Sequence, residues 1–397
     1  MNQLKQDLQK VVTGDVQNSA RIRDEFSHDA SMFEVRPDVV VSPKDSSDIK
    51  AVVAYVSKNK AKHPELAITA RSAGTDMSGA AIGESIILNM RKHFTKIHHV
   101  DGETAHVQPG VLYRDFEPET LKHGALLPPF PASRDLCSVG GMVNNNSGGE
   151  KSLVYGKTEK FVTELSVVFA DGNEYVVKPL TKTELNNKMA QKDFEGKIYR
   201  EVYELVDGNY EEIKAAKPNV SKDSTGYHLW NIWDKETGIF DLTQAIIGAQ
   251  GTLGIVTDIK FRLSKAPKHS GTLVIFMKRT EHLGNIINDV LKHKPATFEG
   301  FDNYTLMLSF KLFFFFHKKL GWWNTIKLGV QLIPDAFLLL RGIPKMVLLV
   351  EFNADTPDEV ARQVHQLRVD LSVYGNDMLF EEDETEAKQQ LLQLYEH

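Results

Sequence analysis

The fold of this chain is decided by one loop and by the elements on either side of it. The loop reads Arg71-Ser72-Ala73-Gly74-Thr75-Asp76-Met77-Ser78-Gly79 and directly follows residues 66–70, an apolar stretch that predicts a buried strand. Earlier, residues 39–41 predict another strand, and apolar residues at helical spacing in 49–56 predict a helix that Asp45 or Ser46 can cap. Strand, helix and strand in this order are typical of the right-handed crossover unit of a parallel sheet.

The composition of the 71–79 loop suits an anion. Small residues let the backbone approach a ligand closely, and successive amides can form a nest for phosphate. Ser72, Thr75 and Ser78 add hydroxyl donors. Neither the dinucleotide-binding G-x-G-x-x-G nor the P-loop G-x-x-x-x-G-K occurs in this segment. Taken alone, the segment is interpreted equally well as a loop of turn-forming residues.

Two further segments are rich in glycine and small polar residues. One spans residues 131–149, ends in Cys137-Ser138-Val139-Gly140-Gly141-Met142-Val143-Asn144-Asn145-Asn146-Ser147-Gly148-Gly149, and is followed by Tyr155-Gly156. The other is Ile246-Ile247-Gly248-Ala249-Gln250-Gly251-Thr252-Leu253-Gly254-Ile255-Val256-Thr257. Without a ligand, the first of these segments could simply be a surface loop, and the second could be a turn that leads into a strand. Because residues 128–160 show little periodicity, we expect them to form an irregular functional loop region.

Periodicity and turn residues predict the remaining elements. Strands are expected at 86–88, 96–97, 105–107, 164–169, 174–177, 255–263, 273–277 and 346–352, with a hairpin turn at Asp171-Gly172. Helices are expected at 112–124, within 181–216, from about 281, at 357–367 and at 381–394. A domain boundary is expected at 265–268.

Composition excludes several classes of protein. The 397 residues are 25% charged and 42% apolar, which is globular composition, and the net charge of −6 argues against nucleic acid as the main partner. Cys137 is the only cysteine, so there is no disulfide framework. The first residues carry no apolar region typical of a secretory signal. The sequence contains no run of 18 apolar residues, so no membrane-spanning helix is predicted.

The order and spacing of the three glycine-rich segments, after the strand–helix–strand opening, resemble the FAD-binding domain of the vanillyl-alcohol-oxidase superfamily, the PCMH type. The resemblance covers about residues 30–265 and is greatest to the branch of D-lactate dehydrogenase and glycolate oxidase catalytic subunits. It implies an α+β fold: a PCMH-type FAD-binding domain of two α/β subdomains, followed by an α+β cap. We expect a helical lead at 1–34, the FAD-binding domain at 35–265 and a substrate or cap domain at 268–397. The branch's H-G-D-G-N-x-H-like motif does not occur, so an incomplete cap is expected.

The resemblance also implies which residues bind the cofactor. Those from the first loop are Arg71, Ser72, Ala73, Gly74, Thr75, Asp76, Ser78 and Gly79. Those from the second segment and the Tyr-Gly pair are Pro131, Ser133, Ser138, Gly140, Gly141, Asn144, Asn145, Ser147, Gly148, Tyr155 and Gly156. Those from the third segment are Gln250, Gly251, Gly254 and Ile255.

The chain departs from the family pattern at a few positions. Ser72 and Ala73 stand where the family loop has glycines, and both are small enough to keep phosphate binding plausible. Covalent members have a flavin-linked histidine where this chain has Thr75, so we expect non-covalent FAD. Gln250 stands where many members have glutamate, and no role is assigned to it.

The expected activity is oxidation of a small D-2-hydroxy acid, such as D-lactate or glycolate, by hydride transfer to flavin N5. Electrons would pass to quinone, cytochrome or another acceptor. No catalytic base is nominated and no metal site is predicted, because the histidines are scattered and His98 and His99 would point to opposite faces of a strand. Cys137 is expected to be a small buried hydrophobe. The alternatives are a same-fold enzyme with a lipophilic substrate, like alkyl-glycerone-phosphate synthase, and a non-catalytic flavin-binding subunit.

Residues 305–341 combine aromatic residues, notably Phe313–Phe316 and Trp322-Trp323, with interleaved lysines. One interpretation is the core and a subunit interface of the cap. The other is a peripheral membrane surface, in which aromatic side chains enter the interface and cations meet anionic lipid. We expect a cytoplasmic protein, which in the second interpretation attaches to the inner face of the membrane.

Overall fold

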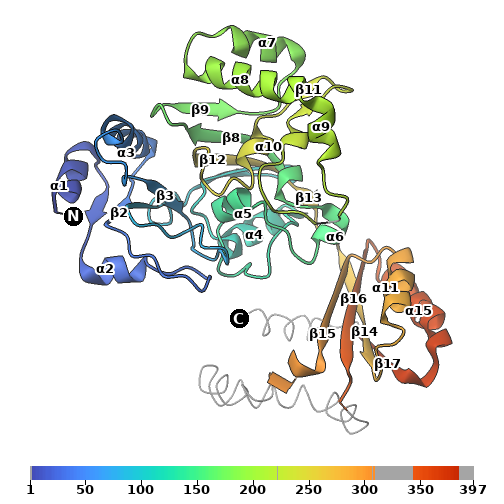
Figure 1. Ribbon diagram of the computed structural model, residues 1–397. Coiled ribbons are helices and arrows are strands. Elements are labelled where there is room, and N and C mark those ends of the chain that lie inside the picture. The colour runs from blue at the N-terminus through green and yellow to red at the C-terminus, as the bar shows by residue number, and fades with distance from the viewer. Residues whose placement is uncertain (1, 221, 306, 309–342, 384–397) are drawn as a thin grey trace. The chain divides into compact units, whose positions relative to one another are not determined.

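The computed structural model describes residues 2–220, 222–305, 307–308 and 343–383 (Figure 1). The chain divides between Ala266 and Pro267 into two compact units. Each unit is described by itself.

The first unit begins with a four-stranded sheet in the order β1-β2-β4-β3. Its strands are β1 (Asp15–Gln17), β2 (Val39–Ser42), β3 (Ile68–Arg71) and β4 (Ile86–Asn89). β2 and β3 both run parallel to β4, which lies between them, and helix α3 (Ser46–Asn59) connects β2 to β3. The carboxylate of Asp45 caps α3 by accepting from the Ser47 amide at 2.9 Å. The predicted strand, helix and strand of a parallel sheet are confirmed.

The N-terminal residues belong to this sheet rather than to helices alone. They form α1 (Asn2–Val11), β1 and α2 (Ala20–Glu25), and β1 pairs antiparallel with β2. Leu8 of α1 is fully buried in the same core cluster as Ile49 of α3. The lead therefore supplies an edge strand as well as helices.

A five-stranded antiparallel sheet in the order β5-β6-β12-β8-β9 forms the larger core of this unit. Its strands are β5 (Ile97–Val100), β6 (Thr104–Val107), β8 (Val162–Val168), β9 (Glu174–Val177) and β12 (Ile255–Arg262). The hairpin predicted at Asp171-Gly172 joins β8 to β9 and is confirmed. β12 comes from far along the chain and lies between β6 and β8, so that Ile259 pairs with both Val107 and Leu165.

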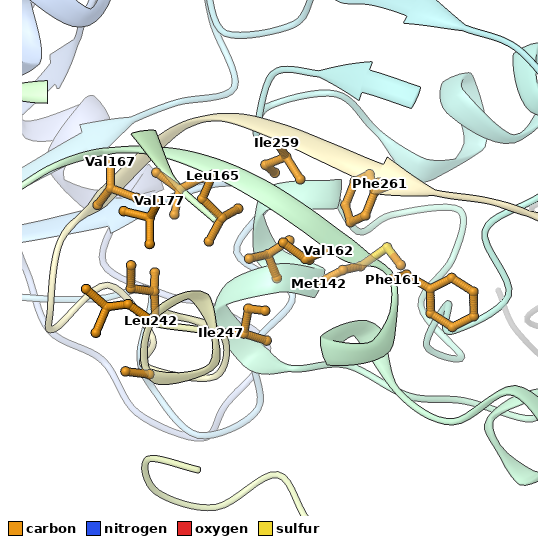
Figure 2. Packing of buried hydrophobic residues seen from close by; sticks show 14 of the residues in the cluster. Met142, Phe161, Val162, Leu165, Val167, Val177, Leu242, Ile247, Ile259 and Phe261 are labelled. Carbon is orange, nitrogen blue, oxygen red and sulfur yellow. The ribbon is translucent and has the colours of Figure 1, made fainter. Parts of the chain in front are cut away.

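Helices and short strands complete the first unit. They are α4 (Tyr113–Lys122), α6 (Ser152–Tyr155), η1 (Thr158–Lys160), α7 (Lys182–Ala190), α8 (Phe194–Gly208), α9 (Tyr210–Ala215), η2 (Leu229–Asn231) and α10 (Thr243–Ile246), with β7 (Ala125–Leu126) paired to β13 (Ser264–Lys265) and β10 (Trp233–Asp234) paired to β11 (Ile239–Phe240). Figure 2 shows the core that they share with the large sheet: Met142 and Ile247, which come from the glycine-rich segments, lie near Val162 and Phe161.

The structure corrects one prediction in the second glycine-rich segment. Where an irregular loop was predicted at 128–160, residues Val139–Asn145 form helix α5, and α6 and η1 follow. Val139, Met142 and Val143 are almost completely buried and occur at the i, i+3, i+4 spacing of one helix face. Burial of that face outweighs the low helix propensity of the glycines and asparagines.

The second unit contains a four-stranded antiparallel sheet in the order β15-β16-β14-β17. Its strands are β14 (His269–Met277), β15 (Thr297–Asp302), β16 (Met346–Ala354) and β17 (Met378–Asp383); its helices are α11 (Leu283–Lys292), α15 (Pro357–Leu371) and η3 (Ser372–Asp377). Residues 381–383 are strand where a helix was predicted, because they pair with β14. The rest of that predicted helix, and nearly all of the aromatic stretch 305–341, lie outside the described residues.

None of the helices in the described part of the chain is both long and apolar enough to cross a membrane.

Candidate cofactor site

The first two glycine-rich segments meet at the end of β3. The Ala73 amide donates to Ser138 Oγ at 3.2 Å, at the start of α5. Asn145 Nδ2, at the other end of α5, donates to Asp76 Oδ1 at 3.3 Å. The 71–79 loop therefore runs alongside α5 and is tied to it at both ends. Residues that are 65 and 69 positions apart in the chain are in contact here.

The third segment joins the same cluster. The Gly248 amide donates to the Val143 carbonyl at 3.0 Å, and the Gln250 amide donates to the Asn144 carbonyl at 2.9 Å. A Cβ placed on Gly251 would lie 3.8 Å from the Cβ of Ala70 in β3. All three segments that the sequence singled out thus surround α5 and the end of β3.

Asp76 holds the first loop in shape. Its Oδ2 accepts from the amides of Ser78 and Ala80, both at 2.9 Å, and from the Ser78 hydroxyl at 2.7 Å. Burial raises the pKa of Asp76, but the hydrogen bonds from Ala80, Ser78 and Gly79 outweigh it, so the pKa lies below its usual value. The carboxylate therefore stays charged at neutral pH and organises the loop backbone.

Arg71 supplies a cation at the start of the loop. Its guanidinium lies 5.3 Å from the centre of the Phe26 ring and donates to the Ala81 carbonyl at 3.2 Å. Burial lowers its pKa, and the nearby Asp29 and Glu25 offset this only in part. A guanidinium nevertheless stays charged at neutral pH. Asp29 and Glu25 act on it through their charge, but no described carboxylate lies within ion-pair distance of it. Its charge is available to an anion.

The backbone of the first loop also leaves donors available. Gly74 has φ +70°, and a Cβ there would lie 2.7 Å from Cζ of Arg71, so glycine lets the guanidinium rest against the loop. Within the described chain, the amides of Gly74 and Thr75 donate to no acceptor. Both residues are half-buried. Free amides beside an unpaired guanidinium are the donor set that a pyrophosphate needs.

α5 leaves room for a methyl group at Gly141, on the side that faces this loop. A Cβ on Gly141 would meet only Ser138 Oγ at 3.6 Å and Ser72 Cβ at 4.0 Å, both ordinary contact distances. A Cβ on Gly140, in contrast, would lie 2.6 Å from the Pro109 carbonyl oxygen. Gly140 therefore allows close packing of the helix, whereas Gly141 keeps the helix surface free of a side chain beside Ser138 and Ser72. The residues present fit an FAD pyrophosphate.

Other predicted site residues lie around this cluster with structural contacts of their own. The Ser133 carbonyl accepts from the Cys137 amide at 2.8 Å, and the Ser147 hydroxyl donates to Asn145 Oδ1 at 3.2 Å. Gly254 packs against Val167, and Ile255 is a buried residue of β12. The structure gives this last pair a packing role. The remaining members of the predicted set are Pro131, Gly148, Tyr155 and Gly156, which lie in or next to the 147–160 stretch or the 131–136 turn.

Cys137 is buried, and burial raises its pKa to about 12. A thiol with so high a pKa stays protonated at neutral pH and is not a nucleophile. Its environment agrees with the interpretation of this residue as a small hydrophobe.

The structure reveals a buried polar network that the sequence did not indicate. His228 Nδ1 lies 2.9 Å from Glu159 Oε2, and Asn146, directly after α5, donates to the same oxygen at 2.5 Å. The Glu159 amide donates back to Asn146 Oδ1 at 3.0 Å. Burial lowers the pKa of the neighbouring Lys157, while Glu159 and Asp223 raise it. The only sequence feature that could have indicated this network is the Tyr155-Gly156 pair, because Lys157 and Glu159 lie within three residues of it. No sequence feature indicated His228.

Comparisons with known proteins agree with this geometry. A family model described as an FAD binding domain matches residues 37–178. The chain is 26% identical over 358 residues to a D-2-hydroxyglutarate dehydrogenase of Pantoea ananatis, covering 89% of this chain and 33% of that protein. It is 27% identical over 289 residues to the glycolate oxidase subunit GlcD of Bacillus subtilis, covering 71% of this chain and 49% of that protein.

Among solved structures, an alkyldihydroxyacetonephosphate synthase superposes with a TM-score of 0.68 at 15% identity, covering 100% of this chain and 63% of the other. At this identity the match shows a shared fold. The chain spans about a third of the length of the D-2-hydroxyglutarate dehydrogenases that it matches. The family match and the cluster of glycine-rich segments lead to one conclusion: this chain contains a PCMH-type FAD-binding domain.

Proposed function

We propose that the protein is an FAD-dependent oxidoreductase that oxidises a small D-2-hydroxy acid. The observation that carries the proposal is the meeting of the three glycine-rich segments around α5, with an unpaired cation and free amides on one side of it. The names of the relatives support the substrate class, since D-2-hydroxyglutarate and glycolate are both 2-hydroxy acids.

Residues of the first two segments would hold the cofactor. Arg71 and the amides of Gly74 and Thr75 would neutralise and hydrogen-bond the pyrophosphate, and the Ser138 hydroxyl and the open face of Gly141 would border it. Bound FAD supplies a hydride acceptor for the substrate C–H. The contribution of this chain is to fix the cofactor's position through loops tied to a rigid sheet.

We further propose that FAD is held without a covalent bond. Thr75 stands in the half-buried part of the first loop, where covalent members of the family have histidine. A threonine hydroxyl offers a hydrogen bond to the cofactor but no ring nitrogen that could bond to it.

Substrate chemistry sets what the remaining residues must do. A 2-hydroxy acid needs a cation for its carboxylate and a base for its hydroxyl proton. No residue is nominated for these roles. Electron transfer to quinone, cytochrome or another acceptor is part of the proposal. For residues 305–341 the two interpretations, a peripheral membrane contact and the core and subunit interface of a cap, are both kept.

Anaerobic reduction of the flavin tests the proposal. The purified chain is loaded with FAD and titrated with D-lactate, glycolate and D-2-hydroxyglutarate in turn, with L-lactate as the stereochemical control. We expect bleaching of the flavin bands by at least one D-2-hydroxy acid or by glycolate. FAD that binds but is reduced by none of them would point to the non-catalytic flavin-binding subunit, or to the lipophilic-substrate alternative. A protein that does not bind FAD would overturn the proposal entirely.

A further inference from the structure

A cluster of metal-ligating side chains lies on the large sheet, outside the cofactor cluster. His98 of β5, His106 of β6 and Asp258 of β12 offer ligand atoms that all lie within 4.8 Å of one another. These are adjacent strands, in the order β5-β6-β12. Their neighbours Ala105, Val107 and Ile259 are buried in the core with α5, so the cluster lies on the opposite face of the sheet.

Two irregularities in strand pairing bring the three residues together. The register of β5 against β6 shifts between Ile97 and His99, which leaves His98 as an extra residue. The register of β12 against β8 shifts between Val256 and Asp258. A β-bulge redirects a side chain away from regular alternation. His98 and His99 accordingly have different partners: His99 Nε2 lies 2.9 Å from Asp101, and His98 reaches Asp258.

Both histidines approach one and the same carboxylate oxygen, instead of forming a chain of hydrogen bonds from one residue to the next. The Nε2 atoms of His98 and His106 both lie 3.0 Å from the same oxygen, Oδ1 of Asp258. Among the described residues, that buried oxygen has no partner in full hydrogen-bond geometry, although both Nε2 atoms lie close to it. The two imidazole rings lie 4.5 Å apart between centres with 33° between their planes. Three ligand atoms therefore converge on a common space without satisfying one another.

Ligand types and spacings fit a zinc ion. Zinc binds imidazole nitrogen and carboxylate oxygen at about 2.0–2.2 Å in a tetrahedron, which places ligand atoms roughly 3.3–3.5 Å apart. The two 3.0 Å separations from Asp258 are a few tenths of an ångström shorter than this, and the ligand atoms of the two histidines lie within 4.8 Å of each other. Imidazole binds a metal in its neutral form and aspartate as the carboxylate, so the metal-bound set would carry one negative charge, which favours a dication. The side chains of His98, His106 and Asp258 are 34%, 35% and 27% exposed, so an ion has access and water can take the fourth position.

The surrounding strands hold the carboxylate in place. The Thr257 hydroxyl lies 2.6 Å from Glu174 Oε1 and 3.1 Å from the Ser166 carbonyl, which fixes the irregular part of β12. On the same face, Lys260 is paired with Glu164 at 2.8 Å. Its charge is thereby compensated and does not compete for Asp258. We propose that His98, His106 and Asp258 form a binding site for Zn²⁺ or a similar divalent metal, which links β5, β6 and β12.

Zinc binding by the untagged full chain tests this proposal. The chain has 14 histidines, so a matched control is essential. The protein is stripped with chelator, dialysed and titrated with ZnCl₂ by calorimetry, without added FAD. The variants are His106→Gln and Asp258→Asn, and the control is His99→Gln, an exposed histidine on the same strand as His98. Melting temperatures without metal verify that every variant is folded.

We expect the wild type and His99→Gln to bind one Zn²⁺ per chain and to melt at a higher temperature with zinc. His106→Gln and Asp258→Asn should each weaken binding at least ~10-fold and lose the zinc-dependent rise in melting temperature. Absence of a stoichiometric site in the wild type would overturn the proposal. So would affinities in both ligand variants equal to those of the wild type and the control.

Discussion

Replacing Gly141 by alanine should change protein stability and FAD affinity in opposite directions. Gly141 lies within α5, and its φ is not among the positive ones. The added methyl group would meet Ser138 Oγ at 3.6 Å and Ser72 Cβ at 4.0 Å, so the free protein accommodates it without displacement. The same methyl group lies on the side of α5 that faces the first loop, where the cofactor pyrophosphate would lie.

The two magnitudes follow from different terms. Alanine is favoured over glycine inside a helix by about 0.5–1 kcal/mol, so the free protein should gain up to that amount. Inserting a methyl group into a tightly occupied contact costs about 1–3 kcal/mol, which corresponds to a roughly 5- to 150-fold larger dissociation constant for FAD. A more stable free protein that binds FAD more weakly would indicate that the methyl group occupies the cofactor's position. General damage to the fold would lower both stability and FAD affinity.

Urea unfolding of the FAD-free protein measures the first effect, and quenching of flavin fluorescence on binding measures the second. Two matched substitutions complete the design. Gly208→Ala, at the end of α8, has nothing within 4 Å of its Cβ and should leave FAD affinity unchanged. Gly140→Ala would place a Cβ 2.6 Å from the Pro109 carbonyl oxygen and should destabilise the protein itself. Unaltered FAD affinity in Gly141→Ala would refute the placement of the pyrophosphate beside α5.

Further predictions concern the cofactor and its supports. Acid precipitation of the FAD-loaded protein should release the flavin into the supernatant, because Thr75 cannot bond to it; yellow colour in the pellet would contradict non-covalent binding. Asp76→Ala should lower stability by about 1–3 kcal/mol at pH 7, through loss of the amide hydrogen bonds to the charged carboxylate. Because the folded pKa of Asp76 lies below its usual 3.8, this contribution is present above that pH and is lost as the pH falls through the folded pKa; urea unfolding of both proteins from pH 7 to pH 3 should show the difference shrinking only at the acid end. Met142→Ala should cost about 2–5 kcal/mol, since the side chain is 1% exposed in the core beneath the cofactor segments, and an unfolding free energy within 1 kcal/mol of the wild type would contradict that packing.

Elements whose signals are local could be predicted from the sequence. β2, α3 and β3 follow from an apolar run, a capping aspartate and helical spacing, all within 35 residues. The β8–β9 hairpin follows from Asp171-Gly172 in the same way. The place of β12 between β6 and β8 depends on contacts across more than 80 residues and has no local signal. α5 had a local signal, the spacing of Val139, Met142 and Val143, but the glycines and asparagines around it indicated a loop.

The same distinction between local signals and distant contacts applies to the candidate site. The small and hydroxyl-bearing residues of the 71–79 loop indicate an anion site by their composition alone, because their chemistry is local. Which of them face the cofactor depends on the contacts to α5, as the different surroundings of Gly140 and Gly141 show. The pairing of His228 with Glu159 joins residues 69 positions apart and could not be inferred from either one.

Strand β12 contributes to both the support of the cofactor site and the proposed metal site, but through opposite faces. Ile259 faces the core that supports α5, whereas Asp258 faces the histidine cluster on the other side of the sheet. Strict alternation would have kept His98 and His99 on opposite faces, and the bulge in β5 is a departure from the two-residue period that no sequence pattern indicates. Since a sheet separates the two groups of ligands, the binding energies should be additive. Asp258→Asn should therefore weaken zinc binding with FAD affinity unchanged, and Gly141→Ala should weaken FAD binding with zinc affinity unchanged; coupling between the two would mean that the sheet itself moves when either ligand binds.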